Sequence, residues 1–264
     1  MSGRPARSWR GVGVAAVGVV VGAFAVAACG NKWDIKRYSG STDKLYQASI
    51  EQFRRHHWDE AVQGFERLTL DLPAHDTLLS QCYFFLGQAH GKKGEPLLAA
   101  QSFERLAEAF PDDSLAPVAL YDAGMSYAAM WRRPQLDPQY GESALGQFQT
   151  LVALYPSSPY KDRADAQMTR LQEWFAIKDY GTGMHYLRRK AYDSAIIYFK
   201  DVVKNYPNAV VTRRAYLRLV DAYRAIHYRD DAADVCNLLH AAYPQDAEVR
   251  RRCGAVATAS VAHP

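Results

Sequence analysis

The chain has 264 residues, and its 32 Lys and Arg against 28 Asp and Glu give a formal net charge of +4. Arg4, Arg7 and Arg10 lie in the first ten positions, so the remaining residues carry 29 basic against 28 acidic side chains. This near-neutral balance lacks the clustered positive charge that nucleic-acid binding requires, and we expect no nucleic-acid partner.

Residues 1–28 predict an export signal. The three arginines precede an apolar stretch, residues 11–28, made of Gly, Ala, Val and one Phe. A basic start followed by a short apolar segment with small residues at its end is typical of secretion signals. A membrane-spanning anchor is the alternative, because ~18 apolar residues are close to the minimum that spans a bilayer. The small residues throughout the stretch favour cleavage.

The end of this signal, Val26-Ala27-Ala28-Cys29, resembles the bacterial lipobox, in which the Cys becomes the lipidated first residue of the mature protein. The resemblance implies a covalent lipid, typically including palmitate, on Cys29 as the only membrane attachment. Gly30 stands where an Asp often retains lipoproteins in the inner membrane, so we expect the periplasmic face of a Gram-negative outer membrane. Residues 29–42 are predicted to form a flexible tether.

From Asp43 onward one pattern recurs five times, namely Ala, an aromatic or apolar residue four positions later, an aliphatic three later, and an apolar residue before Pro. These offsets place the side chains on one face of a helix that ends before the Pro. The five copies are Ala61–Phe65–Leu68–Leu72–Pro73, Ala99–Phe103–Leu106–Phe110–Pro111, Ala144–Phe148–Leu151–Tyr155–Pro156, Ala195–Phe199–Val202–Tyr206–Pro207 and Ala232–Cys236–Leu239–Tyr243–Pro244.

Each copy is interpreted as the second helix of a pair. A small residue twelve positions before the Ala (Ser49, Gly87, Gly183, with Gly124 displaced by an insertion) is expected to face that Ala and bring the helices close. Recurring helix pairs of this kind predict an all-α tetratricopeptide-repeat solenoid of five pairs, about ten to eleven helices.

The spacing of the prolines, 38, 45, 51 and 37 residues, exceeds the ~34 of an uninterrupted repeat. The longer intervals predict an inserted loop from Arg132 to Tyr140 and an extra helical stretch within one long helix from about Tyr160 to Arg188. The predicted organisation is therefore repeats one to three in residues 43–158, the long helix and repeats four to five in 159–250, and a disordered tail in 251–264.

No residue pattern predicts catalysis or a cofactor. His56 and His57 are adjacent, and neighbouring helical positions do not face each other, so they cannot form a metal-binding pair. Cys82 and Cys236 lie at apolar positions and are interpreted as small buried side chains. With Cys253 they leave an odd count after Cys29, which excludes a complete disulfide framework. We expect no metal, no other cofactor and no enzymatic activity.

A binding surface remains, because the first helices of stacked pairs line the hollow side of such an array. Aromatic side chains and Met beside Arg and Lys suit an extended peptide with an aromatic side chain and a free carboxylate. The alternative for each residue is packing between repeats. By helical phase, the residues facing the hollow are Tyr46, Ile50, Phe53, Arg54, Phe84, Gln88, Lys92, Tyr121 and Met125.

The chain from Cys29 to about Pro244 resembles the BamD (ComL) family, the lipoprotein subunit of the outer-membrane β-barrel assembly machinery. The resemblance rests on Leu45-Tyr46, on the segment from Phe148 to Tyr160, and most specifically on Tyr186-Leu-Arg-Arg-x-Ala-Tyr192 followed by Ala195-Ile196. The order of lipobox, three repeats, extra helix and two repeats also agrees with the family.

The resemblance implies a non-enzymatic scaffold that receives unfolded outer-membrane proteins on its N-terminal repeats and docks with its C-terminal repeats on the periplasmic domains of the barrel-forming subunit. Other assembly lipoproteins are further expected partners. For docking, the expected residues are Arg188, Arg189, Tyr192 and Arg218. Many relatives carry Asn-Arg at Ile197-Tyr198, so the contact has to come from nearby arginines here.

Two other functions compete with this one. A periplasmic repeat protein of the cell-envelope or division machinery shares Tyr-Pro-x-Ser repeats, but such proteins usually carry a coiled coil and no lipobox. The other is an enzyme with an appended repeat array. The repeats occupy almost the whole chain after the signal and so leave no room for a catalytic domain.

Overall fold

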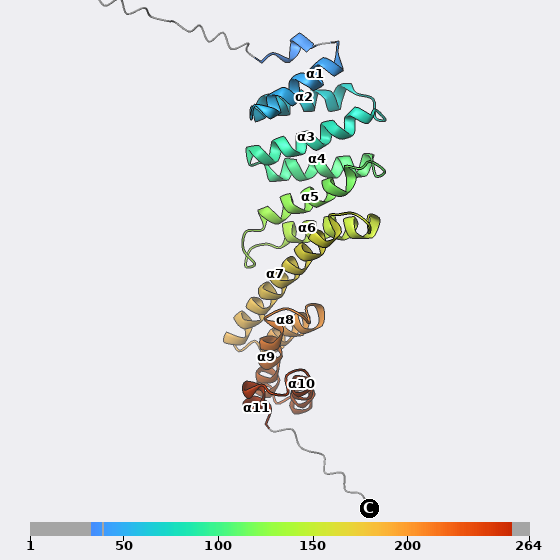
Figure 1. The fold of residues 1–264 in the computed structure, drawn as a ribbon. Helices are drawn as coiled ribbons and strands as arrows, with labels where there is room; N and C mark the ends of the chain where they lie inside the picture. Colours follow the sequence, from blue (N-terminus) through green and yellow to red (C-terminus); the bar gives the residue numbers. More distant parts are fainter. Residues whose placement is uncertain (1–32, 39, 255–264) are drawn as a thin grey trace, which may run out of the picture. The chain divides into compact units, whose positions relative to one another are not determined.

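The computed structural model describes residues 33–38 and 40–254, and its helices all lie in one compact unit that begins at Ile35. The described part of the chain is entirely helical apart from turns and loops (Figure 1). Within it, no helix combines the length and apolar character needed to cross a membrane. The helices are η1 Ile35–Tyr38 (3-10), α1 Thr42–Arg54, α2 Trp58–Asp71, α3 Thr77–Lys93, α4 Pro96–Ala109, α5 Ala116–Met130, α6 Gln139–Leu154, α7 Lys161–Arg188, α8 Tyr192–Asn205, α9 Thr212–Ala225, α10 Arg229–Ala242 and α11 Ala247–Cys253.

The all-α repeat fold predicted from the sequence is confirmed. Consecutive helices from α1 to α10 pack against one another in chain order, so that each pair contacts mainly its neighbours. In every repeat the Ala, the aromatic or Cys, and the following aliphatic residue of the second helix are buried. Each of these helices ends at the residue before the apolar–Pro dipeptide, as the steric restriction on a residue preceding Pro requires.

The glycines of the second, third and fourth first helices have a different partner from the one expected. A Cβ added to Gly87 would lie 2.7 Å from Cε1 of Phe103, and at Gly124 and Gly183 the same carbon would lie 2.6 Å from Cε1 of Phe148 and Phe199. The aromatic residue of the repeat, not its Ala, therefore occupies the space left by the missing side chain. Glycine is required here because ring and helix backbone touch.

The two predicted irregularities are present. The loop between α5 and α6 begins at Trp131, whose buried ring leaves no room for a side chain at Gly141 and packs against Trp174 and Phe175 on α7. Helix α7 has 28 residues and runs through Gly181 and Gly183. Its first half packs against α6 and its second half forms a pair with α8. The expected division of the chain near residue 158 stays a prediction.

The chain before α1 is partly ordered, in contrast to the flexible tether predicted over residues 29–42. Residues Ile35–Tyr38 form a 3-10 helix, and α1 begins at Thr42 after the N-cap Ser41, whose Oγ accepts a hydrogen bond from the Lys44 N–H at 3.4 Å. A Ser that caps the first turn satisfies a free backbone donor and so fixes where the helix starts.

The C-terminal end corrects two predictions. Cys236 is not a free buried thiol, because it forms a disulfide with Cys253, and only Cys82 is a free cysteine among the described residues. The predicted disordered tail from residue 251 is helical as far as Cys253, since α11 folds back and buries Val249 among Leu217, Val220 and Leu239. Residues 255–264 lie outside the described part of the chain.

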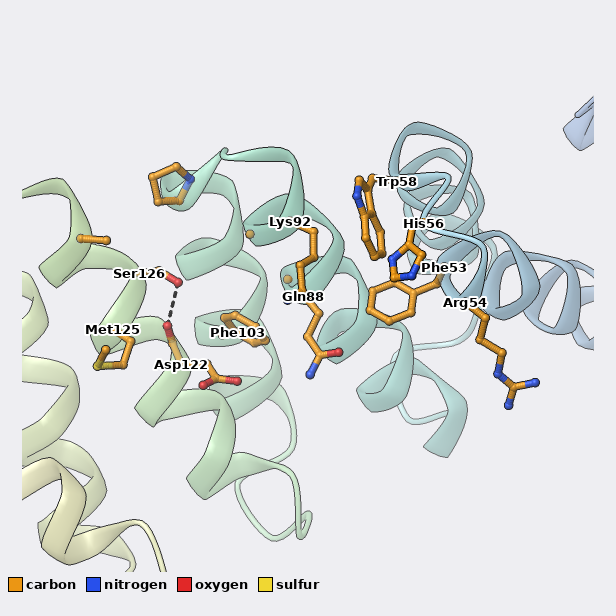
Figure 2. A pocket seen from close by; sticks show the side chains of 14 residues that line it. Phe53, Arg54, His56, Trp58, Gln88, Lys92, Phe103, Asp122, Met125 and Ser126 are labelled. Carbon is orange, nitrogen blue, oxygen red and sulfur yellow. Dashed lines mark hydrogen bonds between the residues drawn. The ribbon is translucent and has the colours of Figure 1, made fainter.

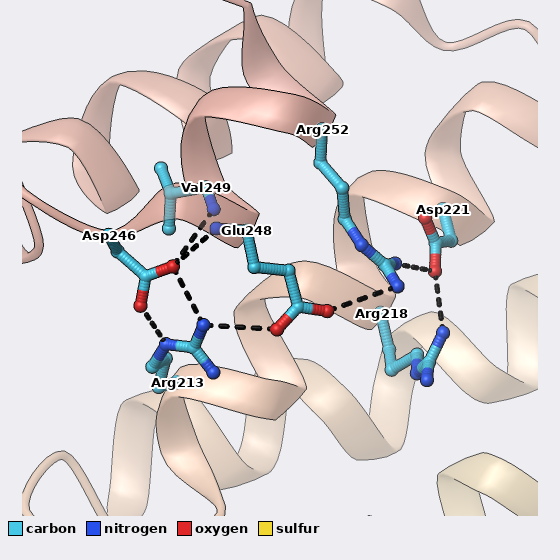
Figure 3. A network of polar contacts seen from close by, with 7 residues as sticks. All are labelled: Arg213, Arg218, Asp221, Asp246, Glu248, Val249 and Arg252. Atoms are coloured by element: carbon cyan, nitrogen blue, oxygen red, sulfur yellow. Dashed lines mark hydrogen bonds and ion pairs between the residues drawn. The ribbon is translucent and has the colours of Figure 1, made fainter.

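A network of charged residues also holds α11 against α9 (Figure 3). The Arg213 guanidinium donates to Asp246 at 2.8 Å and to Glu248 at 3.0 Å, and Arg252 pairs with Asp221. The hydrogen bonds from Arg213 hold the pKa of the Asp246 carboxyl below its usual range. Asp246 also caps the first turn of α11 by accepting from the backbone N–H groups of Glu248 and Val249.

Candidate functional site

A pocket of about 660 Å³ opens between the first three repeats, and its lining comes from α1 to α5. Figure 2 shows Gln88 and Lys92 of α3 between the aromatic side chains that follow α1 and the polar and apolar side chains of α5. The volume is that of an ordinary small-ligand or side-chain pocket. The lining residues are Phe53, Arg54, His56, Trp58, Gly87, Gln88, Gly91, Lys92, Pro96, Phe103, Asp122, Met125, Ser126 and Ala129.

Of the nine residues expected from helical phase, this pocket brings five together, namely Phe53, Arg54, Gln88, Lys92 and Met125. Each comes from a first helix, which is why helical phase alone could find them. The site assignment itself stays a prediction, because position in a pocket does not test binding.

The other four expected residues pack inside or between repeats. Tyr46 and Ile50 are buried, and the Tyr46 hydroxyl donates a hydrogen bond to Oε1 of Gln81 at 2.7 Å. Phe84 packs against Phe103, and Tyr121 packs against Phe148 and Tyr160. Phe84 and Tyr121 each precede a pocket residue, Gln88 and Met125, by four positions and so lie on the same helix face. Only the packing of the neighbouring helices decides whether such a side chain lines the pocket or is buried.

The aromatic wall of the pocket was incompletely predicted. The rings of Phe53 and Trp58 meet edge to face at 5.2 Å, and His56 contacts Trp58 at 4.9 Å. His56 has a φ of 62°, a left-handed conformation that reverses the chain between α1 and α2 and so places Trp58 beside the end of α1. The signal that could have indicated Trp58 is its position immediately after this turn.

Two positively charged side chains are among the residues that line the pocket. Arg54 and Lys92 are exposed on the surface, and neither forms an ion pair with another described residue. Unpaired cations beside aromatic rings are suited to a carboxylate next to an aromatic or apolar side chain.

Asp122 on α5 gives the pocket a carboxyl group that has a raised pKa and no cationic partner among the described residues. Its side chain points into the pocket (Figure 2), and within the described part of the chain it has no cationic partner. Partial burial raises the pKa of the Asp122 carboxyl to about 6, because removal from water disfavours the charged form. A carboxylate here repels another carboxylate and accepts hydrogen bonds from N–H groups.

The residues expected to dock a partner fall into two places. Arg188 ends α7, Arg189 follows it, and Tyr192 begins α8, so these three share one turn, in which Lys190 has a φ of 61°. Both arginines are exposed. Arg218 lies on α9 instead, where it donates to Asp221 at 2.9 Å as part of the charged network of Figure 3.

The two residues that replace Asn-Arg have separate environments. Ile197 on α8 is 60% exposed, whereas Tyr198 stacks on Tyr186 with ring centroids 5.5 Å apart. An exposed apolar side chain therefore lies in the second turn of α8, the helix that follows the turn of Arg188 and Arg189. The predicted lipidation site, Cys29, and the signal sequence lie outside the described residues.

Comparison with known proteins places the chain in a family. The model of the family YfiO, described as an outer membrane lipoprotein, matches residues 39–238. The outer membrane protein assembly factor BamD of Vibrio cholerae is 26% identical over 197 residues, covering 71% of this chain and 81% of that protein. BamD of Caulobacter vibrioides is 25% identical over 230 residues, covering 87% of this chain and 73% of that protein.

Solved structures of repeat proteins are also similar to it. The tetratricopeptide-repeat domain of P58(IPK) has 14% sequence identity and a TM-score of 0.44, and it covers 80% of this chain and 54% of its own. The TPR2AB domain of yeast Sti1 has 14% identity and a TM-score of 0.38, with 80% and 81% covered. Because the family model spans most of the chain, the chain belongs to the YfiO family of outer membrane lipoproteins.

Proposed function

We propose that this protein is a non-enzymatic scaffold of outer-membrane protein assembly, and that the pocket between its first three repeats receives the C-terminal segment of unfolded barrel proteins. The relatives named above are assembly factors for outer membrane proteins, and the family is one of lipoproteins. Its anchor is a lipid on Cys29, and it works at the periplasmic face of the outer membrane.

The observation that carries the proposal is the combination of the aromatic wall of Phe53 and Trp58 with the unpaired cations Arg54 and Lys92 in one pocket. A peptide that ends in an aromatic residue offers both matching groups on adjacent atoms. The ring packs on the wall, and the terminal carboxylate lies beside the guanidinium and the ammonium group. Such a contact is weak, so the client peptide dissociates once its strand is transferred.

A peptide titration tests the pocket. A fluorescently labelled peptide from the last strand of a barrel protein, ending in Phe, is titrated with the purified full-length protein while anisotropy is measured. The double variant Arg54→Gln/Lys92→Gln is expected to bind about tenfold more weakly, because two charge-assisted contacts are lost at a partly screened surface. Capping the peptide with an amide is expected to weaken binding to the native protein but not to the variant.

Arg105 provides the matched control, because it is an exposed arginine on α4 that does not line the pocket. Arg105→Gln is expected to bind like the native protein. If the double variant and the control bind equally well, or if the amide cap has no effect on the native protein, the pocket is not the client site.

For docking on the barrel-forming subunit, we propose the turn of Arg188, Arg189 and Tyr192 together with the exposed Ile197. Co-purification after mild membrane extraction tests this surface. Arg188→Glu/Arg189→Glu is expected to reduce recovery of the barrel-forming subunit strongly. Arg229→Glu, an exposed position in the first turn of α10, serves as the control. Undiminished recovery with the double variant would exclude this turn.

A further inference from the structure

A second, smaller pocket of about 140 Å³ lies between α5 and α7. An apolar cavity of ~150 Å³ holds one benzene-sized group, so this pocket has room for a single apolar side chain. Its lining residues are Met125, Ala128, Ala129, Gln167, Arg170, Leu171 and Trp174.

The small pocket adjoins the larger one. Met125 and Ala129 line both, so the two spaces are separated by no more than the side chains of one helix face. Met125 is a flexible side chain that adapts to neighbours of different shape. A chain that leaves the first pocket past α5 therefore reaches the second without crossing another helix.

In the small pocket, the ring of Trp174 packs against neighbouring side chains. Trp174 meets the buried Trp131 edge to face at 5.4 Å, and Trp131 in turn fills the space over Gly141. The exposed Arg170 places its guanidinium 5.6 Å from the centre of the Trp174 ring. The pocket wall thus combines the indole of Trp174, which Trp131 supports, with the hydrogen-bonding side chains of Arg170 and Gln167.

The charges along the groove give a bound peptide a direction. Arg54 and Lys92 lie on α1 and α3, the carboxylate of Asp122 on α5, and Arg170 on α7. Asp122 repels a terminal carboxylate, and the carboxylate meets two cations on the α1 and α3 side of Asp122 but only Arg170 on the α7 side. The end of the peptide accordingly lies at α1 and α3, and its upstream residues run past Asp122 toward α7.

We propose that the pocket of Arg170 and Trp174 is a second subsite for the same client peptide and receives one apolar side chain upstream of its C-terminal residue. This inference rests on the proposed function of the first pocket. Packed helices lie ~8–10 Å apart and an extended chain advances ~3.3 Å per residue, so two repeats correspond to roughly six residues. The client is thus recognised by a terminal aromatic residue and an apolar residue about six positions before it.

Peptides of two lengths test the subsite. A four-residue peptide ending in Phe reaches only the first pocket, and a ten-residue peptide with Leu at the sixth upstream position reaches both. The variant Arg170→Gln/Trp174→Leu is expected to bind the long peptide about fivefold more weakly, because a partly buried apolar side chain loses its contact. Its affinity for the short peptide is expected to stay unchanged.

Arg163 gives a matched control on the same helix, since its guanidinium also lies over a ring, 5.8 Å from the centre of Tyr160, but it does not line the pocket. Arg163→Gln is expected to bind both peptides normally. The single variant Arg170→Gln leaves the packed Trp174 in place. It therefore tests the subsite without the risk of unfolding the protein.

Replacing the upstream Leu of the long peptide by Ser supplies a second measurement on the native protein. The change is expected to weaken binding about fivefold there and to have no further effect on the Arg170→Gln/Trp174→Leu variant. The subsite alone would be overturned if that variant weakened the binding of both peptides equally. It would also be overturned if a Leu→Ser change had no effect on affinity at any upstream position. Failure of both peptides to bind the native protein would overturn the first pocket as well.

Discussion

Gly183 on α7 and Phe199 on α8 touch so closely that a methyl group has no place between them. A side chain there forces the ring or the helix to move, and overpacking of this kind costs ~1–3 kcal/mol. The same contact recurs at Gly87 with Phe103 and at Gly124 with Phe148. In these three repeats the paired helices approach closely at this point, and the glycine permits the approach.

We predict that Gly183→Ala lowers the free energy of unfolding by about 1 kcal/mol, since the clash outweighs the ~1 kcal/mol that Ala contributes to a helix. Gly181, two residues earlier on the same helix, has nothing within 4 Å of an added Cβ. Gly181→Ala is therefore expected to stabilise the protein by ~0.5–1 kcal/mol. Thermal unfolding followed by circular dichroism compares the two, and equal effects of the same sign would contradict this explanation.

The carboxyl of Asp122 makes stability depend on pH. Its pKa is raised by burial to about 6, above the ordinary value of 3.8, so the folded protein binds a proton more tightly than the unfolded chain. Stability from this group is present below pH 3.8 and is lost as pH rises through about 6.

Asp122→Asn removes this titration. We predict that the variant and the native protein unfold alike near pH 4, and that at pH 7.5 the variant is more stable by about 1 kcal/mol, after allowance for solvent screening at a partly exposed group. Chemical denaturation at the two pH values measures the difference. Asp112→Asn, an exposed position outside the pocket, is expected to give no such divergence.

At the scale of the elements, the turns between paired helices share one backbone feature. His56, Gly94, Lys190 and His227 have φ values of 62°, 79°, 61° and 64°, and each precedes the Ala of its repeat by five positions. In the third repeat the residue five positions before the Ala is Gln139, and it lies within the first turn of α6. The inserted loop replaces the tight turn there. The left-handed conformation lets two antiparallel helices connect in a few residues.

Glycine adopts this conformation without the steric cost that other residues incur. We predict that Lys190→Gly and His227→Gly, both at exposed positions, each stabilise the protein by ~0.5–1 kcal/mol. Gly94→Ala is expected to destabilise it by ~1 kcal/mol for the same reason. Urea denaturation gives the three values; destabilisation by either substitution to glycine would show that the backbone at these turns is not strained.

At the scale of the whole molecule, the described helices contact mainly their neighbours in sequence, so a local change is expected to stay local. The C-terminal end has its own attachment, because the seven-residue α11 is held by the Cys236–Cys253 disulfide and by the charged network around Arg213. A helix this short is not stable on its own.

We predict that Cys253→Ser lowers the stability of the last repeat by ~3 kcal/mol, the value typical of a disulfide that closes a loop of this length. Hydrogen exchange is expected to increase in α10 and α11 while α1 to α5 keep their protection. Cys82→Ala, which removes a buried free thiol, is expected to perturb the first two repeats instead. Loss of protection throughout the chain in Cys253→Ser would refute the independence of the repeats.

The sequence by itself determined the helices of the repeats, the end of the second helix in each pair, and the pairing of neighbours. The Ala–Phe–Leu face and the Pro that follows it act within one helix, and the limits on φ and ψ before Pro hold in any context. The long helix α7 and the loop before α6 followed from the same spacing argument, because an interval longer than one repeat has to be filled by additional structure.

Only the tertiary structure decided which first-helix residues face the pocket and how the chain ends. Tyr46 and Arg54 belong to one helix, yet the next repeat buries Tyr46 against Gln81 and leaves Arg54 free. Asp122 and Trp174 acquire their roles from neighbouring repeats, and Cys236 finds Cys253 only because α11 folds back onto α9 and α10. Contacts between repeats depend on the packing of side chains that are distant in sequence, and a pattern local to one helix does not decide them.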